Sequence, residues 1–379
     1  MPTKYDVFAK LIEKAPCKAK DLNFETPIYN HINSLIQKSW IKNQNKLYYP
    51  IKNKTTNIIF EIIKYSLKNG LNYNLLFSQN LPIIVNELNK NSPNLRPKKL
   101  QSNKENIKLL QYLEKNQFLL IYKKKPRKGI ILKHKLIENI LKLNELKIEI
   151  KTNYKNIKNE ILKIKTNPIN PFEDNIFEFL SGSAQLEGST ITAGETKDLI
   201  LNEIYPDKPK KDIQMVKNLN EAMYYIIENY NKEITPEDIK EINKLVMFSL
   251  HRNAGKYKIN QNKIQGNPSF KTSNPKEVPL EMNNYCDMLK KINNKEKCLI
   301  NIGKIHNDLQ RIHPFADGNS RTTRMILNWM LIKNNLPLLI LKMGCFDEYM
   351  QLTKLSKKRD DERLSLLFYH ILVHENLIN

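Results

Sequence analysis

One twelve-residue stretch, HPFADGNSRTTR at residues 313–324, holds several side chains that can do chemistry together. His313 is the one nearby group that can take up a proton near neutral pH. Asp317 offers the oxygen ligand with which proteins usually hold Mg²⁺ beside phosphates. Arg321 and Arg324 stand three residues apart at the start of a predicted helix, so both project from one face and can grip phosphate oxygens. The stretch therefore predicts a site for the phosphates of a nucleotide and their metal.

Two predicted helices position this stretch. The run EKCLINIGKIHNDLQRI precedes it and the run RTTRMILNWMLIK follows it, both with helical apolar spacing. The Gly-Asn-Ser turn at 318–320 would then lie at a helix N-terminus, where unpaired N–H groups and the helix dipole favour an anion. Gly318 permits close backbone approach or a positive φ. His306, on the preceding helix, is predicted to be structural.

The charge of the chain is unevenly distributed. Residues 1–165 contain 33 Lys and Arg against 12 Asp and Glu, whereas the remaining residues contain 29 against 27, so nearly all of the net charge of +23 lies in the N-terminal part. The four cysteines lack CxxC spacing, which argues against a zinc site and a disulfide framework. The sequence shows neither a signal peptide nor an apolar run near the roughly 20 residues that span a bilayer. A cytoplasmic protein without membrane contact is expected.

The basic part is predicted to contain two winged-helix-like regions, at residues 1–55 and 56–135. In the first, TPIYNHINSLIQKSW predicts a helix with Thr26 as N-cap and Pro27 in the first position, and WIKNQNKLYYPI predicts a short β-hairpin. Basic side chains at such surfaces contact phosphates, so DNA is the expected partner. A solvated hairpin and a protein-binding winged helix remain alternatives. The candidate nucleic-acid residues are Tyr29, Asn30, Asn33, Gln37, Lys123, Lys124, Lys125, Arg127 and Lys128.

Helix signals dominate the rest of the chain. Residues 136–168 predict a charged helical connector, and residues 169–379 an all-α domain. The motifs NPFE at 170–173, TPED at 235–238 and NPKE at 274–277 each offer an Asn or Thr N-cap, a Pro and an acid, and predict three helix starts. Residues 256–271 lack a helical period and predict a β-hairpin flap. The expected fold class is mainly α, with an all-α core and this flap, preceded by a basic α+β region.

The twelve-residue stretch closely resembles the Fic motif, H-x-F-x-(D/E)-G-N-G-R-x-x-R, in every fixed position except Ser320, where the family has Gly. The resemblance extends from about residue 170 to 370 and includes AGKYK at 254–258 and NLPLLIL at 335–341. It implies an all-α Fic core that transfers AMP from ATP to a Ser, Thr or Tyr hydroxyl of a protein. Attack at the α-phosphorus needs a base, a metal and fixed donors around the developing charge.

The resemblance also implies a role for each motif residue. His313 would be the base, Phe315 would anchor the loop in the core, and Asp317 would bind Mg²⁺. The α-phosphate and the rest of the phosphate chain would be held by Gly318, Asn319, Ser320, Arg321 and Arg324.

A second stretch, SGSAQLEGSTIT at 181–192, fits the family's inhibitory-helix signature, (S/T)-x-x-x-E-(G/N), at Ser183, Glu187 and Gly188. The helix is expected at about 172–188. The resemblance implies autoinhibition, because Glu187 and the γ-phosphate would compete for Arg324. Some relatives use this glutamate to position a water and remove AMP, and the sequence leaves that open here.

Two alternatives to AMP transfer remain at this point. In the related Doc branch the position of Ser320 is Lys, the nucleotide lies reversed and the γ-phosphate is transferred, so a Doc-like kinase or another nucleotidyl transferase is one alternative. The other is a DNA-binding transcriptional regulator with a nucleotide-sensing Fic core. The resemblance further implies that a target protein adds as a strand beside flap residues 259–270. The sequence leaves a homodimer open.

Overall fold

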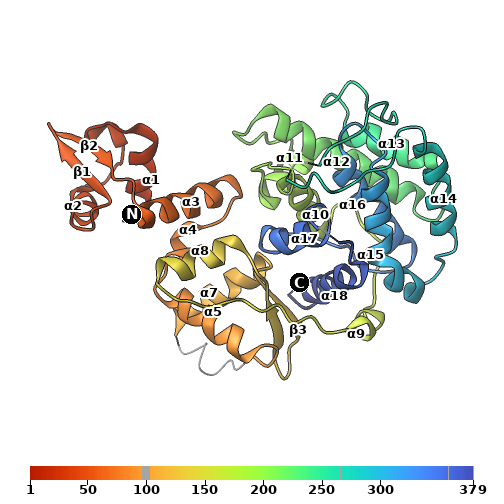
Figure 1. The fold of residues 1–379 in the computed structure, drawn as a ribbon, viewed down its shortest axis with the longest axis horizontal. Coiled ribbons are helices and arrows are strands. Elements are labelled where there is room, and N and C mark those ends of the chain that lie inside the picture. The colour runs from red at the N-terminus through yellow and green to blue at the C-terminus, as the bar shows by residue number, and fades with distance from the viewer. Residues whose placement is uncertain (96–102, 265, 357, 379) are drawn as a thin grey trace. The chain divides into compact units, whose positions relative to one another are not determined.

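The computed structural model describes residues 1–95, 103–264, 266–356 and 358–378, and it is mainly helical, as predicted (Figure 1). The chain divides into two compact units. Unit 1 comprises Met1–Asn86 and Lys135–Glu149, and unit 2 comprises Glu87–His134 and Ile150–Asn379. This division differs from the predicted boundaries after residues 55, 135 and 168. Among the described residues, no helix has the length and apolar character needed to cross a membrane.

Unit 1 is built from short helices and one hairpin. Its elements are α1 (Lys4–Lys14), the 3₁₀ helix η1 (Ala19–Leu22), α2 (Tyr29–Gln37), β1 (Ile41–Gln44), β2 (Leu47–Pro50), α3 (Lys54–Lys68), α4 (Tyr73–Leu76) and α8 (Lys135–Leu143). The antiparallel β1–β2 hairpin confirms the one predicted at this place. Helix α2 begins later than predicted, because Ile28 is its N-cap without a side-chain bond, whereas Thr26 and Pro27 precede the helix. Helix α5 (Asn80–Asn91) crosses the division between the units.

The basic segment 87–134 belongs to unit 2 and supplies α7 (Lys104–Lys115), β3 (Leu119–Lys123) and β4 (Lys128–Ile131). Strand β3 packs on the C-terminal helix α18 (Asp361–Ile378). The Ile121 amide donates to His374 Nδ1 at 2.9 Å, and the Gly344 amide donates to the Asn116 carbonyl at 2.8 Å. The region predicted at 56–135 as one winged-helix-like domain is therefore split between the two units, and its residues 96–102 lie outside the described residues.

The predicted helical connector at 136–168 is largely wrong. Helix α8 belongs to unit 1, and α9 (Lys158–Leu162) is the one helix assigned between residues 144 and 168, all of which are described. The backbone there finds tertiary partners instead of helical ones. The Lys155 amide donates to His370 Nε2 at 3.0 Å, and the Lys151 amide donates to Asn89 Oδ1 at 3.1 Å. These bonds satisfy backbone groups that a helix would otherwise pair internally.

Helices form the rest of unit 2. They are α10 (Asp174–Gln185), α11 (Ala193–Asn202), α12 (Lys210–Asn229), α13 (Pro236–Val246), α14 (Val278–Lys290), α15 (Lys295–Ile312), α16 (Asn319–Lys333), the 3₁₀ helix η2 (Met343–Cys345), α17 (Phe346–Leu352) and α18. Helix α16 is central, since every residue from Asn319 to Ile332 is buried. It packs against α10, α12, α13 and α15.

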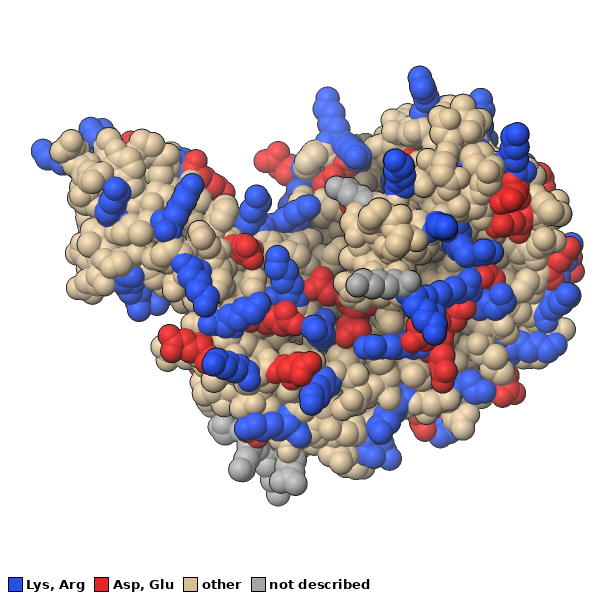
Figure 2. All heavy atoms as spheres, in the orientation of Figure 1, with Lys and Arg blue, Asp and Glu red and all other residues tan. Residues whose placement is uncertain are grey.

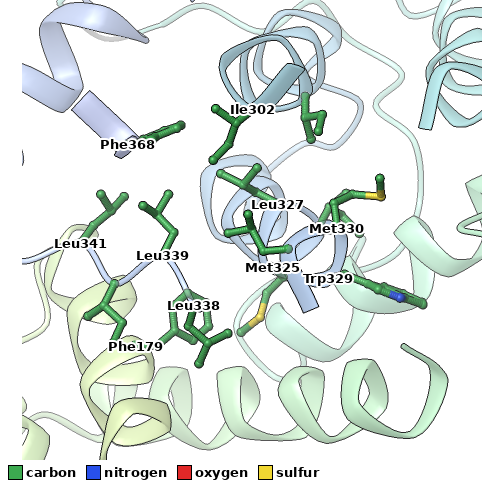
Figure 3. Close-up of a cluster of buried hydrophobic side chains, with 14 of the residues drawn as sticks. Phe179, Ile302, Met325, Leu327, Trp329, Met330, Leu338, Leu339, Leu341 and Phe368 are labelled. Carbon is green, nitrogen blue, oxygen red and sulfur yellow. The ribbon is translucent and has the colours of Figure 1, made fainter. Parts of the chain in front are cut away.

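Apolar side chains around α16 form the core of unit 2 (Figure 3). Leu327 and Trp329 of α16 are fully buried, and Ile302 of α15 and Phe368 of α18 join the same cluster. Burial of a side chain of this size contributes about 1.5–3 kcal/mol. A helix that is buried on all sides needs apolar residues around its whole circumference, which explains why MILNWMLI has no polar face. The core fixes the start of α16, where the predicted phosphate site lies.

One of the three predicted helix starts is confirmed. Thr235 caps α13 with a capping box to Asp238, and Pro236 opens the helix. The other two predictions are three residues early, since α10 begins at Asp174 and α14 at Val278. In both cases the predicted Asn cap accepts a hydrogen bond from the amide two residues later, at 3.0 Å. The asparagine side chain therefore makes a local turn instead of an N-cap.

The flap region 256–271 contains no strand among its described residues, so the predicted β-hairpin is wrong. Side-chain amides take the place of a strand ladder. Gln261 Nε2 donates to the Thr272 carbonyl at 2.9 Å, and Asn262 Nδ2 donates to the Phe315 carbonyl at 3.1 Å. An isolated antiparallel bridge joins Tyr257 to Phe315. The segment is thereby attached to the motif loop. Residue 265 lies outside the described residues.

The structure locates the basic excess of residues 1–165 more finely than the sequence does. Unit 1 contains 15 Lys and Arg against 8 Asp and Glu, whereas the unit 2 segments 87–134 and 150–165 contain 18 against 4. On the face shown in Figure 2, Lys and Arg side chains are spread among Asp and Glu instead of forming one pure patch. Most of the positive excess therefore belongs to the unit that contains the motif loop.

Candidate active site

The motif loop joins the end of α15 to the start of α16. His313 is the C-cap of α15 with φ +50°, and its amide donates to the Leu309 carbonyl at 3.0 Å. Gly318 is the N-cap of α16 with φ +78°. A Cβ at Gly318 would meet Met247 Cγ and Sδ at 2.6 Å, so both the backbone conformation and the space require glycine. The amides at the start of α16 are thus presented by a turn that closely contacts α13.

Asparagine side chains fix the shape of the loop. Asn319 Oδ1 accepts from the Phe315 amide at 2.9 Å, and Asn319 Nδ2 donates to the Phe315 carbonyl at 2.8 Å. Phe315 itself is fully buried in the core. From α13, Asn243 Nδ2 donates to the Asp317 carbonyl and to Thr322 Oγ1, both at 3.1 Å. Phe315 and Asn319 therefore anchor the loop from within, while Asn243 holds it from outside.

His313 is a buried and neutral imidazole. Its Nδ1 lies 3.2 Å from the Gln310 carbonyl oxygen, and a proton donated from Nδ1 to that oxygen leaves Nε2 as the basic nitrogen. Burial lowers the pKa of His313 to about 4, and the cations of Lys354 and Lys258 act in the same direction. The side chain is consequently unprotonated at neutral pH and is able to accept a proton.

Lys258 holds the backbone on both sides of His313. Its amide donates to the Pro314 carbonyl at 2.8 Å, and its Nζ donates to the Ile312 carbonyl and to Thr272 Oγ1, both at 3.2 Å. Burial lowers the pKa of Lys258 to about 8. One residue of the AGKYK segment thereby fixes the two carbonyls that flank the candidate base.

Arg321 is buried, and some of its hydrogen-bond donors have no partner among the described residues. It is 5% exposed, and its Nη2 lies 3.6 Å from Asp317 Oδ1. Its Nε and Nη1 have no hydrogen-bond partner among the described residues. Burial lowers its pKa from the usual value, while Glu187 and Asp317 oppose this effect. Unsatisfied guanidinium donors are costly in a folded protein unless a ligand completes them, so Arg321 suits a phosphate.

Arg324 is occupied by α10 and the residues directly after it. Its Nε donates to Ser183 Oγ at 2.8 Å, and its Nη2 donates to the Ser183 carbonyl and to Glu187 Oε1, both at 2.9 Å. The Arg324 side chain is 3% exposed and that of Glu187 is 24% exposed. Burial alone would raise the pKa of Glu187, but the cations of Arg324, Lys354 and Arg321 together lower it to about 2. The pair is thus fully ionised at neutral pH.

Two glycines and a serine complete this part of the site. A Cβ at Gly182 would meet the Leu341 carbonyl at 2.4 Å, so this glycine allows α10 to approach closely enough for Ser183 to reach Arg324. Gly188 follows Glu187 with φ +93° and ends the turn after the helix. Ser320 is 5% exposed at the start of α16, where the family motif has glycine.

A second layer supports Arg324 from the far side. Tyr349 of α17 lies beside its guanidinium, and the Tyr349 hydroxyl lies 2.8 Å from His306 Nε2. Burial lowers the pKa of His306 to about 3, so this residue is neutral and packed, in line with the structural role predicted for it. Lys354 is half-buried just after α17, and its pKa is lowered by burial and by the two motif arginines.

The residues present are suited to one Mg²⁺ shared with a nucleotide. The Asp317 side chain is 57% exposed, beside the buried Arg321. Its Oδ1 accepts from the Gly318 amide at 2.6 Å, which orients the carboxylate. Among the described residues, no group of three or more His, Cys, Asp or Glu side chains could hold a metal. One carboxylate plus phosphate oxygens and waters is the usual coordination of Mg²⁺ at such sites.

The candidate nucleic-acid residues do not form one surface in either unit. Tyr29, Asn30, Asn33 and Gln37 are all exposed on α2 of unit 1, whereas residues 123–128 form the β3–β4 turn of unit 2. Arg127 makes an ion pair with Glu114 and is half-buried. The two predicted sets therefore need separate functional hypotheses.

Several site residues were missed by the sequence analysis. Asn243, Lys258, Tyr349 and Lys354 lie far from the motif in the chain and reach it through folding. Asn243 carries a weak signal, because it is an asparagine between the apolar Ile242 and Val246 on a helix. Lys258 ends the AGKYK stretch that belongs to the resemblance, although no role was predicted for it, and Tyr349 and Lys354 give no signal by residue type.

The chain is similar to known proteins over part of its length. The profile of the Fic/DOC family matches residues 233–331. A protein adenylyltransferase Fic from Nematostella vectensis is 27% identical over 183 residues, which cover 46% of this chain and 42% of that protein. One from Aedes aegypti is 27% identical over 187 residues, covering 47% and 36%. A Fic domain containing signaling protein from Bacteroides thetaiotaomicron superposes with a TM-score of 0.47 at 22% identity, covering 57% of this chain and 90% of that one. The alignments thus span less than half the length of both adenylyltransferase relatives.

Proposed function

Because the C-terminal half of the chain carries a Fic/DOC domain, we propose that this protein is a Mg²⁺-dependent protein adenylyltransferase. It transfers AMP from ATP to a Ser, Thr or Tyr hydroxyl of a target protein. The relatives from sea anemone and mosquito bear the name protein adenylyltransferase. The observation that carries the proposal is the arrangement at the start of α16, where the loop with the neutral buried His313 leads into the first turn of α16 with Arg321, whose Nε and Nη1 have no hydrogen-bond partner among the described residues.

Each motif residue has a defined part in the transfer. The target hydroxyl oxygen forms a bond to the α-phosphorus, the bond from that phosphorus to the β-phosphate bridging oxygen breaks, and pyrophosphate leaves. His313 Nε2 takes the hydroxyl proton. The amides of Asn319 and Ser320 would donate to the α-phosphate, whereas the Gly318 amide, predicted to join them, already donates to Asp317 Oδ1. Arg321 would direct its buried donors to the phosphate chain. Asp317 would hold Mg²⁺, which would supply positive charge against the developing negative charge.

Autoinhibition is the second element of the proposal. The contact between Arg324 and Glu187, supported by Ser183, occupies the guanidinium that the γ-phosphate would otherwise bind. ATP must therefore displace Glu187, or bind without using Arg324. The side chain of Glu187 is held by a single hydrogen bond and is partly exposed, so it can rotate away without disrupting the core. Whether Glu187 also directs a water to remove AMP belongs to the same proposal and is tested by release of AMP from a labelled target.

The test uses ATP labelled at either the α- or the γ-phosphate. Full-length wild type, Glu187→Gly and His313→Ala are incubated with Mg²⁺, labelled ATP and cell lysate. We expect protein label from the α position alone, stronger with Glu187→Gly and absent with His313→Ala. Loss of a general base typically lowers the rate by about 10²- to 10⁴-fold. Label from γ alone would favour the Doc-like kinase, in which Ser320 would accompany the reversed nucleotide. Absence of label from both positions would contradict the transferase proposal.

For unit 1 we propose DNA binding through α2 and the hairpin that follows it. The supporting observation is that the four polar residues predicted on the outer face of α2 are all exposed, while Ile32 and Leu35 on its inner face are buried. Phosphate contacts at a winged-helix-like surface predict an affinity that falls steeply with salt. Fluorescence anisotropy with a labelled duplex tests this, and wild type is compared with Asn33→Asp. If DNA is bound but no protein is labelled, the regulator with a nucleotide-sensing core is the better interpretation.

For the target protein, we propose docking beside residues 259–270. The support is that Asn262 Nδ2 donates to the Phe315 carbonyl, so this segment lies against the motif loop, and a strand added beside it would place its hydroxyl near His313.

A further inference from the structure

A cavity of about 600 Å³ lies in unit 2, outside the motif loop. Its wall is made by the end of α7, the β3–β4 turn, Glu178 of α10, Lys342 and the end of α18. This volume falls within the range of pockets that hold small molecules. Its basic lining residues are Lys115, Lys124, Lys125, Arg127 and Lys342.

The cavity has an excess of positive charge. Arg127 is paired with Glu114, and Lys342 is paired with carboxylates behind it. Lys115, Lys124 and Lys125 have no ion pair among the described residues, and all three are exposed or half-exposed on the wall. A group of like charges around one cavity repels itself and favours an anion. Phosphate is the anion best suited to several ammonium and guanidinium groups at once.

The cavity also touches the helix that precedes Glu187. Glu178 lies on α10, and its Oε2 is 2.9 Å from Lys342 Nζ. Lys342 Nζ is equally close, at 2.9 Å, to Glu375 Oε2. The Glu375 side chain is 5% exposed and also accepts a hydrogen bond from Gln117, whereas that of Glu178 is 24% exposed. Of the two carboxylates on Lys342, Glu178 is therefore the one that an incoming anion can replace.

We propose that this cavity binds a phosphate-bearing anion, which takes Lys342 from Glu178 and thereby loosens the helix that positions Glu187. The anion is an oligophosphate chain or a short run of nucleic-acid phosphodiesters. Its binding needs only the cavity, whereas the consequence for Glu187 rests on the autoinhibition proposed above. The basic turn at residues 123–128 then binds a regulatory anion on unit 2, and its function is separate from the DNA binding proposed for α2.

Binding is measured first, by isothermal titration calorimetry of the full chain with inorganic tripolyphosphate and, separately, with a 12-nucleotide single strand. The test variant is Lys124→Gln/Lys125→Gln. The matched control is Lys276→Gln/Lys291→Gln, which removes two exposed lysines of the same unit away from the cavity. We expect about five- to twentyfold weaker binding in the test variant alone. The probe that shows this loss identifies the source of the phosphate. Equal binding to all three proteins, or to none, would overturn the proposal.

Loosening of α10 is measured by hydrogen–deuterium exchange of the peptide covering residues 174–188. Adding the anion is expected to raise exchange about two- to fivefold in wild type and control, and to leave the test variant unchanged. An anion acting directly at Arg324 would raise exchange equally in all three proteins, and that result would overturn the inference. Neither measurement uses AMP transfer. If no label is transferred but the test variant alone binds the anion more weakly, the proposed function is rejected and the anion-binding site is retained.

Discussion

Two cations hold helix α10 and the residues directly after it, Arg324 at the C-terminal end and Lys342 at Glu178 closer to the N-terminus, and they do so in different ways. At its C-terminal end, Arg324 makes three hydrogen bonds to Ser183 and Glu187 and is 3% exposed. Nearer its N-terminus, Glu178 meets Lys342, which is 15% exposed and shared with Glu375. A planar guanidinium with several fixed partners holds one geometry, whereas a lysine ammonium tolerates several.

Because the arginine and lysine contacts differ in this way, we expect them to have different functions. At the arginine end, the Arg324 guanidinium presents its donors in a fixed geometry. A phosphate that replaces Glu187 there must accept hydrogen bonds in the same geometry. At the lysine end, the strength of the contact between Glu178 and Lys342 depends on the other charged groups near Lys342. Substrate competition is therefore expected at Arg324, and adjustment by a second ligand at Lys342. The predictions below weaken one end at a time.

The largest effect is expected from Glu187→Gln, which keeps the shape of the side chain but removes its charge. Because an ion-paired hydrogen bond to a buried arginine is lost, ATP affinity should rise about 10- to 100-fold. The measurement is ATP binding to the full chain by calorimetry, with α-label transfer as a second readout. The control is Glu221→Gln on α12, since Glu221 is exposed and has no ion pair among the described residues. Unchanged ATP affinity would show that the arginine end does not restrain the nucleotide.

A smaller effect is expected from Ser183→Ala. The substitution removes the hydroxyl that accepts from Arg324 Nε, while the Ser183 carbonyl continues to accept from Nη2. ATP affinity should rise about two- to tenfold, since one neutral partner of a charged donor is lost. Ser181→Ala is the matched control, because Ser181 is buried on the same helix and its hydroxyl donates only to the Glu178 carbonyl. A gain of the same size in both variants would attribute the effect to helix stability instead.

These two substitutions could be chosen from the sequence through the inhibitory-helix signature at Ser183 and Glu187, whereas the motif at residues 313–324 carries its own chemistry. Residues 313–324 are local in the chain, and their caps and turn follow from a positive φ at Gly318 and from the helix start at Asn319. The contact from Glu187 to Arg324 joins residues far apart in the chain, and it was foreseen through the family signature alone.

Other parts of the fold depended on packing that the sequence does not display. Lys258 and Asn243 hold the loop by donating to its backbone carbonyls. Every residue has such a carbonyl, so the sequence does not mark these contacts. The composition of the basic turn at 123–128 predicts a DNA-binding wing, yet strand β3 packs on α18 and belongs to unit 2. The segment after α8 has helical composition, but its amides find partners such as His370 Nε2 in other elements. In each case a tertiary hydrogen bond overrides a local preference.

The lysine end is tested by Glu178→Gln without any added anion. The substitution leaves Lys342 paired with Glu375 alone, so α10 should loosen slightly while the core stays intact. We expect about two- to fivefold faster exchange in the peptide covering 174–188 and a rise in ATP affinity of no more than about threefold. Glu173→Gln is the control, since Glu173 is the exposed N-cap of the same helix and makes no ion pair among the described residues. A rise in ATP affinity as large as that of Glu187→Gln would mean that the two contacts restrain ATP binding together as one unit.

The smallest effect is expected from pH. The pKa of Glu187 is lowered to about 2, so its pairing is fully present above the ordinary carboxyl value of 4.5 and is lost only as pH falls from there through about 2. The pKa of Lys342 is raised, because its two carboxylates outweigh burial, so Lys342 stays charged below 10.5. Burial raises the pKa of its partner Glu375, so falling pH removes the charge of Glu375 earlier than that of an ordinary carboxylate. Between pH 5 and 9 the pair of Glu187 and Arg324 does not titrate, so the ratio of ATP affinities between Glu187→Gln and wild type should stay constant. A ratio that falls toward one as the pH drops from 7 to 5 would show that a different titrating group holds the helix, and the contrast between its arginine and lysine ends would then fail.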